Sequence, residues 1–291
     1  MAEFTEQVVA GLATGSLFAL LALALVLIYQ STEIVNFAQG EMAMFSTFIA
    51  WSLAQDVGFW PAVFLAVGAA FLIGAAVERV VMRPVENAPE LNGVIVTLGL
   101  FAVFNSVALW IYGPIAKRFE NPFDRPVDLG PVIVSGVNLA ALGAAVIIMT
   151  LMFLLFRYTK VGLAMRATAE NRTAARLMGI RTGWMLSLGW GLATAVGAVA
   201  GILVAPVVFV SPNMLFSLFL FAFASAVLGG LTSPAGAILG GLALGVLRNL
   251  AATYVPEIGS QLDTVIALAV IIAILMVRPE GLLGHRRLKK V

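Results

Sequence analysis

Three polar side chains lie close together at the start of an otherwise apolar segment. In VNFAQGEMAMF, residues 35–45, they are Asn36, Gln39 and Glu41. Two amides and a carboxylate supply hydrogen-bond donors and acceptors. A charge facing lipid at the bilayer centre costs about 2.5–3.5 kcal/mol on insertion-type scales. We therefore expect Glu41 to face protein, water or lipid headgroups.

Two interpretations of these residues are open. Glu41 could cap the start of a helix, with Asn36 and Gln39 satisfying backbone groups at a break between two apolar segments. Alternatively, this broken element lines a transport pathway, and Glu41 helps to hold a gate on its cytoplasmic half closed by hydrogen bonding. Further candidates for the pathway, or for interhelical hydrogen bonds, are Thr97, Asn105, Arg248 and Asn249.

The surrounding segments are apolar enough to lie in a membrane. Hydrophobic residues make up 61% of the 291 residues and charged residues 11%, whereas soluble domains carry about 25% charged residues. A spanning helix needs about 20 mostly apolar residues. Such stretches occur at about 8–29, 37–54, 60–82, 93–113, 137–156, 184–209, 215–231, 234–252 and 262–277.

These segments lack the alternation of polar and apolar residues that is typical of barrel strands. The sequence therefore predicts an all-α, polytopic membrane protein with eight to nine membrane-entering helices, some of them broken or re-entrant. We find no linker or soluble domain, so residues 1–291 are expected to form a single membrane domain.

The distribution of Lys and Arg predicts the orientation. They concentrate in residues 157–181 and in the tail from His285 to Lys290, and both are expected in the cytoplasm by the positive-inside rule. The loop 114–136 is placed outside. The first 78 residues contain no Lys or Arg, so the N-terminus lies outside if nine segments cross and inside if eight do.

Small residues recur every four positions in three stretches, which we predict to be helix-packing surfaces. They are Gly11, Gly15 and Ala19; Gly189, Ala193, Gly197 and Gly201; and Gly229, Ser233, Ala237, Gly241 and Gly245. In VLGGLTSPAGAILGG, residues 227–241, Gly229, Gly230 and Pro234 interrupt an apolar run. They indicate either a tight turn or a broken helix, and broken helices mark the pathway in transporters.

Residues 159–182 are too polar to cross a membrane and have a helix-forming composition. They predict a short amphipathic helix that Gly179 terminates, with Ala167, Ala174, Ala175, Leu177 and Met178 at its apolar or small positions. On composition alone, an interfacial helix held to anionic lipid by its arginines is one interpretation.

The order of residues favours another interpretation. AARLMG, residues 174–179, has the Ala-Ala-x-x-x-Gly core of the cytoplasmic loop through which ABC importer permeases engage their ATPases. The longer stretch RATAENRTAARLMGI resembles the version in branched-chain amino acid permeases of the LivH type. VNFAQGE and VLGGLTSPAGAILGGLALG resemble two further elements of that family, in its order and at about its spacing. The chain departs from the family at Gln39, where histidine is common.

The resemblance assigns the two groups of candidate residues. It implies an ATPase coupling loop over about 157–182, with Arg166, Glu170, Arg172, Ala174, Ala175 and Gly179. It also implies a translocation pathway or gate near Asn36, Gln39, Glu41, Thr97, Asn105, Gly229 and Gly230.

A permease subunit of an ABC importer in a bacterial inner membrane, with a cytoplasmic C-terminus, is therefore implied. Its expected partners are a second related permease, two cytoplasmic ATPase subunits, a periplasmic solute-binding protein and membrane lipid, but no nucleic acid. The substrates implied are branched-chain amino acids or related small amides and carboxylates. No cofactor or metal is expected on this chain, and ATP is hydrolysed by the partners, since the chain has no phosphate-binding G-x-x-x-x-G-K-[ST] loop.

Two other classes compete with this one. A secondary transporter or channel for a small polar solute would need intramembrane acids for ion coupling, and Glu41 is the only carboxylate well away from a segment end. An integral-membrane enzyme is the other class, but the sequence offers few catalytic side chains for it, since it has no cysteine and His285 is the single histidine.

Overall fold

Eleven α-helices and a small hairpin make up the described part of the computed structural model, which covers residues 2–86, 88–120, 122–123, 127–128, 133–254, 263–278 and 280–284. The helices are α1 (Ala2–Thr32), α2 (Gln39–Val57), α3 (Phe59–Val77), α4 (Glu90–Tyr112), α5 (Gly136–Tyr158), α6 (Lys160–Glu170), α7 (Arg172–Leu177), α8 (Thr182–Val208), α9 (Phe216–Gly229), α10 (Pro234–Tyr254) and α11 (Asp263–Val277). A π-helix, η1 (Glu78–Met82), and a 3-10 turn, η2 (Arg83–Val85), extend α3. Strands β1 (Val127–Asp128) and β2 (Ile133–Val134) pair antiparallel.

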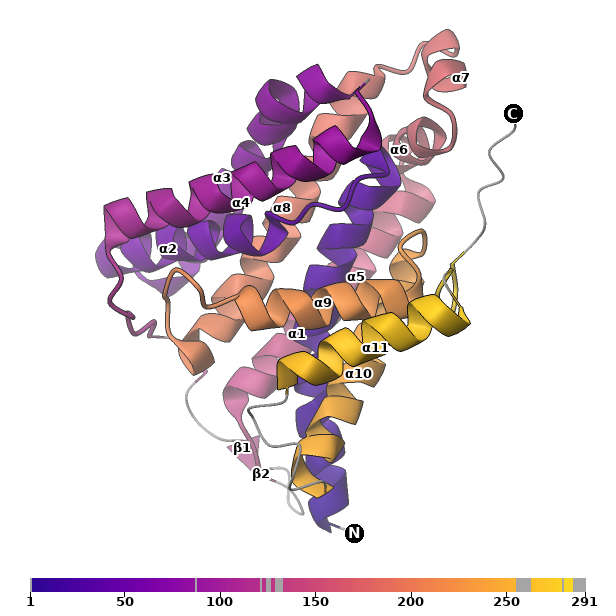
Figure 1. Cartoon of the computed structure of the whole chain (residues 1–291). Coiled ribbons are helices and arrows are strands. Elements are labelled where there is room, and N and C mark those ends of the chain that lie inside the picture. Colours follow the sequence, from indigo (N-terminus) through magenta and orange to yellow (C-terminus); the bar gives the residue numbers. More distant parts are fainter. Residues whose placement is uncertain are drawn as a thin grey trace.

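The central element is α1. In its most apolar stretch, 89% of the residues are buried, because α5, α8, α9 and α10 pack around it. Figure 1 shows its N-terminal end at the same end of the molecule as β1 and β2, with α6 and α7 at the opposite end. If residues 157–181 face the cytoplasm, α1 starts outside.

A seam of glycines joins α1 to α10. A Cβ atom on Gly245 would lie 2.2 Å from the Cα of Gly15, and one on Gly241 would lie 2.5 Å from the backbone nitrogen of Ala19. Two of the predicted small-residue stripes therefore pack directly against each other. The close approach needs glycine, since backbone atoms occupy the space that a methyl group would take.

This seam predicts a large difference between two Gly→Ala substitutions. Gly245→Ala is expected to lower the free energy of unfolding by about 1–3 kcal/mol, because its methyl group forces α1 and α10 apart. Gly143→Ala in α5 is the control, since nothing lies within 4 Å of its Cβ position. Thermal unfolding of both purified variants in detergent measures the effect; equal melting temperatures would contradict the tight seam.

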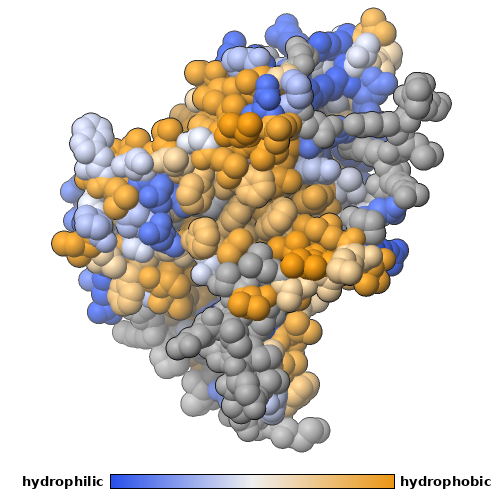
Figure 2. Space-filling model, in the orientation of Figure 1, coloured by the Kyte–Doolittle hydropathy of each residue, from blue (hydrophilic) through white to orange (hydrophobic). Residues whose placement is uncertain are grey.

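The fold is that of a polytopic membrane protein. In the described residues, six helices are long and apolar enough to cross a membrane: Phe4–Thr32, Phe59–Val85, Leu91–Tyr112, Gly136–Tyr158, Thr182–Val208 and Pro234–Tyr254. The surface in Figure 2 is largely hydrophobic across its middle. The all-α membrane fold is thus confirmed.

Three of the expected segments form helices that are shorter, or have a shorter apolar part, than the six candidate membrane-spanning helices. Segments 37–54, 215–231 and 262–277 correspond to α2, α9 and α11, and α9 and α11 have only 14 and 15 residues. The 19-residue α2 carries Gln39, Glu41, Gln55 and Asp56 near its two ends, which shortens its apolar part.

The interrupted stretch 227–241 forms a turn between two helices. Gly230 has a φ of 103°, and Pro234 starts α10 at a position that suits proline. The backbone N–H groups of Leu282 and Leu283 donate to the carbonyls of Leu228 and Gly229, at 2.8 and 3.0 Å. Gly230 allows residues 280–284 to pack closely on this turn, and Gly229 allows the first turn of α10 to do so at Gly236. The basic tail from His285 to Lys290 lies outside the described residues.

Candidate functional site

Two helices, α2 and α9, begin inside the molecule after irregular segments. The chain leaves α1 at Glu33 (φ 58°) and leaves α8 at Phe209 (φ 60°). A left-handed backbone at a non-glycine residue costs of the order of 1–3 kcal/mol, and the surrounding structure must hold it. These two residues therefore mark the points at which the chain turns inward, through residues 33–38 and 209–215.

Contacts with α8 place the start of α2. The Nε2 atom of Gln39 donates to the carbonyl of Ala193, at 3.1 Å. At 1.5 Å per residue, Ala193 lies about 16 Å along α8 from Thr182. Gly197 leaves the space for Gln39, because a Cβ there would lie 2.5 Å from Nε2. Helix α2 therefore starts about halfway along a membrane-spanning helix.

The start of α9 lies at the same level. A Cβ on Gly40, in the first turn of α2, would lie 3.2 Å from the Cβ of Phe219 in α9. The ring of Phe37 also lies 6.5 Å from that of Phe219, between centroids. The starts of α2 and α9 thus pack against each other.

Polar groups surround the start of α2, with Gln39 facing α8 and Glu41 facing α4. We call them together the polar cluster: the side chains of Asn36, Gln39, Glu41, Thr97, Asn105 and Asn213, and the carbonyl of Pro212. Asn36 makes the turn that leads into α2, because its Oδ1 accepts a hydrogen bond from the backbone N–H of Ala38, at 3.1 Å. Its Nδ2 donates to Oε1 of Gln39, at 3.3 Å. Both side chains are fully buried, so these bonds satisfy groups that would be costly to bury alone.

Glu41 is the charged member of the polar cluster and is 3% exposed. Its Oε2 accepts a hydrogen bond from Nδ2 of Asn105, at 3.1 Å. In the described part of the chain, none of the ion pairs includes Glu41. It lies in the first turn of α2, which has Ala38 as N-cap and no side-chain capping bond. The helix dipole still favours a carboxylate there, but Asn36, not Glu41, makes the turn.

Asn105 links Glu41 to the second irregular segment. Its Nδ2 also lies 3.0 Å from the carbonyl of Pro212 and 3.1 Å from Oδ1 of Asn213. Because one amide group has only two hydrogens, its three acceptors share them. Asn213 is exposed. The hydrogen bonds therefore lead from the buried carboxyl group to the protein surface.

Thr97 is joined to the polar cluster by contacts with backbone carbonyl groups. Its Oγ1 donates to the carbonyl of Val94 at 2.9 Å and lies 3.4 Å from that of Val35. Pro212 and Asn213 were missed by the sequence-based prediction. The only local signal is the turn-forming Ser-Pro-Asn sequence between two apolar segments, and it does not reveal the contact with Asn105.

Other predicted pathway residues lie apart from the polar cluster. Gly229 and Gly230 are at the far end of α9, about 20 Å from its start by helical rise. Asn249 donates to the carbonyl and the Oε1 of Gln7, both at 2.8 Å. Asn249 thus makes the predicted interhelical bond, between α10 and α1.

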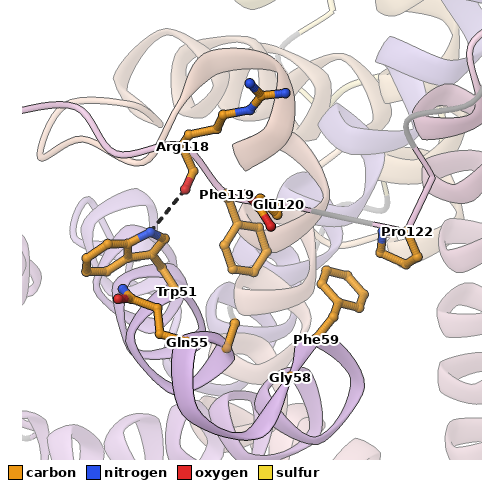
Figure 3. Close-up of a pocket in the computed structure, with 9 residues that line it drawn as sticks. Trp51, Gln55, Gly58, Phe59, Arg118, Phe119, Glu120 and Pro122 are labelled. Carbon is orange, nitrogen blue, oxygen red and sulfur yellow. Dashed lines mark hydrogen bonds between the residues drawn. The ribbon is translucent and has the colours of Figure 1, made fainter.

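A separate cavity of about 630 Å³ opens at the other end of α2, beside the turn into α3. Figure 3 shows Trp51, Phe59 and Phe119 along its wall, with the Arg118 guanidinium pointing away. Trp51 Nε1 donates to the Arg118 carbonyl, at 3.1 Å. No residue of the polar cluster lines this cavity.

The predicted coupling loop forms two helices instead of one. Asn171 ends α6, and its Oδ1 caps α7 by accepting from the backbone N–H of Ala174, at 2.9 Å. Gly179 (φ 81°) ends α7, with bonds from Ile180 N to the Ala175 carbonyl and from Gly179 N to the Arg176 carbonyl, both 3.0 Å. These are the two bonds of a Schellman motif. Gly179 is thus the predicted terminator.

The loop residues differ in what they present to a partner. Leu177 and Met178 are 84% and 81% exposed, whereas Ala175 is buried. Arg166, Glu170, Ala174 and Gly179 are exposed. Arg172 turns inward, where its guanidinium donates to Glu86 and to the Ser31 carbonyl.

Buried polar groups at helix breaks inside a bundle of membrane-spanning helices define a membrane transport protein. The sequence profile described as "Branched-chain amino acid transport system / permease component" matches residues 7–275. The chain belongs to this family. It is a permease component of a branched-chain amino acid ABC transport system, and not an enzyme.

Individual relatives agree. The chain is 29% identical to the high-affinity branched-chain amino acid transport system permease protein LivH of Escherichia coli (strain K12), with 99% of this chain and 98% of that protein covered. It is 30% identical to the permease protein BraD of Pseudomonas aeruginosa, with the same coverage. A probable LivH of Methanocaldococcus jannaschii is 27% identical, over 95% of this chain and 92% of that protein.

One solved structure has a similar fold. It is described as PsaBC from Streptococcus pneumoniae in complex with Fab, with a TM-score of 0.51 and 13% sequence identity. The match covers 93% of this chain and 91% of that one. At this identity the likeness concerns the fold alone.

Proposed function

We propose that this chain is one of two permease subunits of a bacterial inner-membrane importer, and that its polar cluster lines the path of the substrate. The observation that carries the proposal is the meeting of two helix starts around buried Glu41, with hydrogen bonds leading to exposed Asn213. Helix starts inside a membrane are a recurrent feature of substrate sites in transporters. Branched-chain amino acids, or related small amides and carboxylates, are the proposed substrates.

In this proposal α2, α9 and α11 also enter the membrane, which gives nine membrane-entering segments. The N-terminus lies outside, the coupling loop and the C-terminus lie in the cytoplasm, and a solute-binding protein delivers substrate from the periplasm. Two ATPase subunits bind the cytoplasmic side, where the exposed side chains of Leu177 and Met178 are the apolar contacts that a protein partner would cover. The isolated chain is expected to hydrolyse no ATP.

Reconstitution tests the transport function. The chain, its related permease and the ATPases are reconstituted in liposomes, and the solute-binding protein is added. Uptake of labelled leucine, isoleucine and valine is then measured. Uptake is expected only with ATP and all subunits. Uptake that persists without the ATPases would show a channel or secondary transporter, and the importer proposal would be wrong.

Thiol accessibility tests the path itself, because the chain has no cysteine of its own. In the assembled transporter, Asn213→Cys is expected to react with a water-soluble thiol reagent, and substrate turnover should change the rate. Phe64→Cys is the control, since Phe64 is 73% exposed on α3 and is expected to face lipid. Equal labelling of the two positions under all conditions would contradict a path at Asn213.

A further inference from the structure

We propose that Arg172 is a positioning residue that connects the coupling loop to the irregular segment 33–38 and so to the polar cluster. The proposal rests on the proposed function of the loop as the ATPase docking site. Arg172 therefore has a different role from its exposed neighbours: it transmits the position of α7, and it does not contact the ATPase. We call its bonds to Glu86 and to the Ser31 carbonyl the Arg172 link.

The geometry of the Arg172 link is that of a connector. Arg172 is the first residue of α7, and its side chain is 28% exposed, while that of Glu86 is 18% exposed. One terminal nitrogen of the guanidinium donates to Glu86 and the other to Ser31. A planar fork can hold two acceptors in fixed directions, which a flexible ammonium group cannot do. The Arg172 link therefore fixes α7 relative to the end of α1 and to the segment before α4.

Glu86 is itself held in place. Its backbone N–H donates to the Arg83 carbonyl, at 3.2 Å. The Arg83 guanidinium contacts buried Glu78 at 3.0 Å and donates to the Gly183 carbonyl, at 2.8 Å. This second set of bonds ties η2 to the start of α8. These bonds thus fix the position of Glu86, so a movement of α7 changes its distance from Glu86.

Ser31 connects the link to the polar cluster along the chain. Two residues later Glu33 adopts its left-handed conformation, and the residues that follow it pack against α4. The Ile34 side chain fills the space beside Gly93, where a Cβ would lie 2.3 Å from Cδ1. Thr97 then contacts the Val35 carbonyl, and Asn36 follows. A shift of Ser31 therefore reaches Asn36 within five residues, through a segment that already carries backbone strain.

The surroundings give the link room to change. A cavity of about 330 Å³ lies beside it, lined by Ser31, Glu33, Glu86, Glu170 and Arg172 among others. Arg176 of α7 also lies 3.9 Å from Glu86. If α7 moved away, both guanidinium groups would leave Glu86, which lines this cavity together with Glu170, and repulsion between the two carboxylates would favour its opening. The arrangement therefore favours two states, one with the link made and one with it broken.

The test measures transport and ATP hydrolysis together in the fully assembled transporter. Arg172→Ala is expected to keep the ATPases bound and hydrolysing, while the amount of leucine transported per ATP falls at least tenfold. Glu86→Gln should lower this ratio less, because it keeps an acceptor for the guanidinium. Arg172→Lys should give a value between that of Arg172→Ala and that of the unsubstituted protein, since one ammonium group replaces the fork only in part. Arg79→Ala is the control, because Arg79 is an exposed arginine of η1 on the same side and should leave the ratio unchanged.

Two results would overturn the proposal. Loss of the ATPases from the Arg172→Ala or Glu86→Gln complex would make these residues part of the docking surface or of its fold. An unchanged ratio of transport to hydrolysis in Arg172→Ala would show that the link transmits nothing. Failure of the docking role is seen separately, in substitutions of Leu177 and Met178, which lie outside the Arg172 link.

Discussion

Replacing Leu177 and Met178 together with glutamate is expected to release the ATPase subunits while the permease remains folded. Both side chains are more than 80% exposed, so they contribute little to the stability of the isolated permease. Burial of each in an interface contributes about 1.5–3 kcal/mol, and two added carboxylates make the same burial unfavourable. Affinity should therefore fall at least about a hundredfold.

Co-purification of the ATPases with the tagged permease from detergent measures this effect. Ile115→Glu is the matched control, since Ile115 is an exposed apolar residue (76%) outside the coupling loop, and this variant should retain the ATPases. If the double variant also retains them, α7 lies on the membrane surface as an interfacial helix, and the docking surface is elsewhere.

The second large effect is expected at Glu41. Glu41→Ala should reduce transport at least tenfold with little loss of stability, because Asn105 keeps its two other acceptors at Pro212 and Asn213. If Glu41 were purely structural, its removal would lower the melting temperature and leave transport by the folded protein unchanged. Glu41→Gln keeps an acceptor for Asn105 and should transport better than the alanine variant.

Uptake by the reconstituted complex and the melting temperature of the variant permease are measured side by side. Full transport by Glu41→Ala at unchanged assembly would remove Glu41 from the proposed path. A lower melting temperature that accounts for the lost transport would support the structural interpretation instead.

Local chemistry in the sequence was sufficient for several features. Small residues every four positions predicted close helix packing, although not that α1 pairs with α10, and Gly179 predicted the end of α7. Composition alone predicted the membrane-embedded helical fold. These features depend on residues close together in the chain or on a regular spacing, and so a single sequence reveals them.

Other features depend on contacts between distant segments. Asn213 joins the polar cluster across more than a hundred residues, through Asn105. The inward turn of Arg172 depends on where α1 ends. The level at which α2 starts is set by α8, through Gln39 and Ala193. No periodicity in the sequence encodes such pairings, which is why Pro212 and Asn213 were missed.

The burial of α1 has a consequence for how the protein is made. This helix is synthesised well before α10, yet its glycine face packs on α10, which begins some 200 residues later at Pro234. At about 5–20 residues per second, that interval lasts roughly 10–40 s. During this time Gly11 and Gly15 face lipid or the insertion machinery. Because the first 78 residues carry no Lys or Arg, local charge specifies the orientation of α1 only weakly, and packing against its later partners helps to fix it.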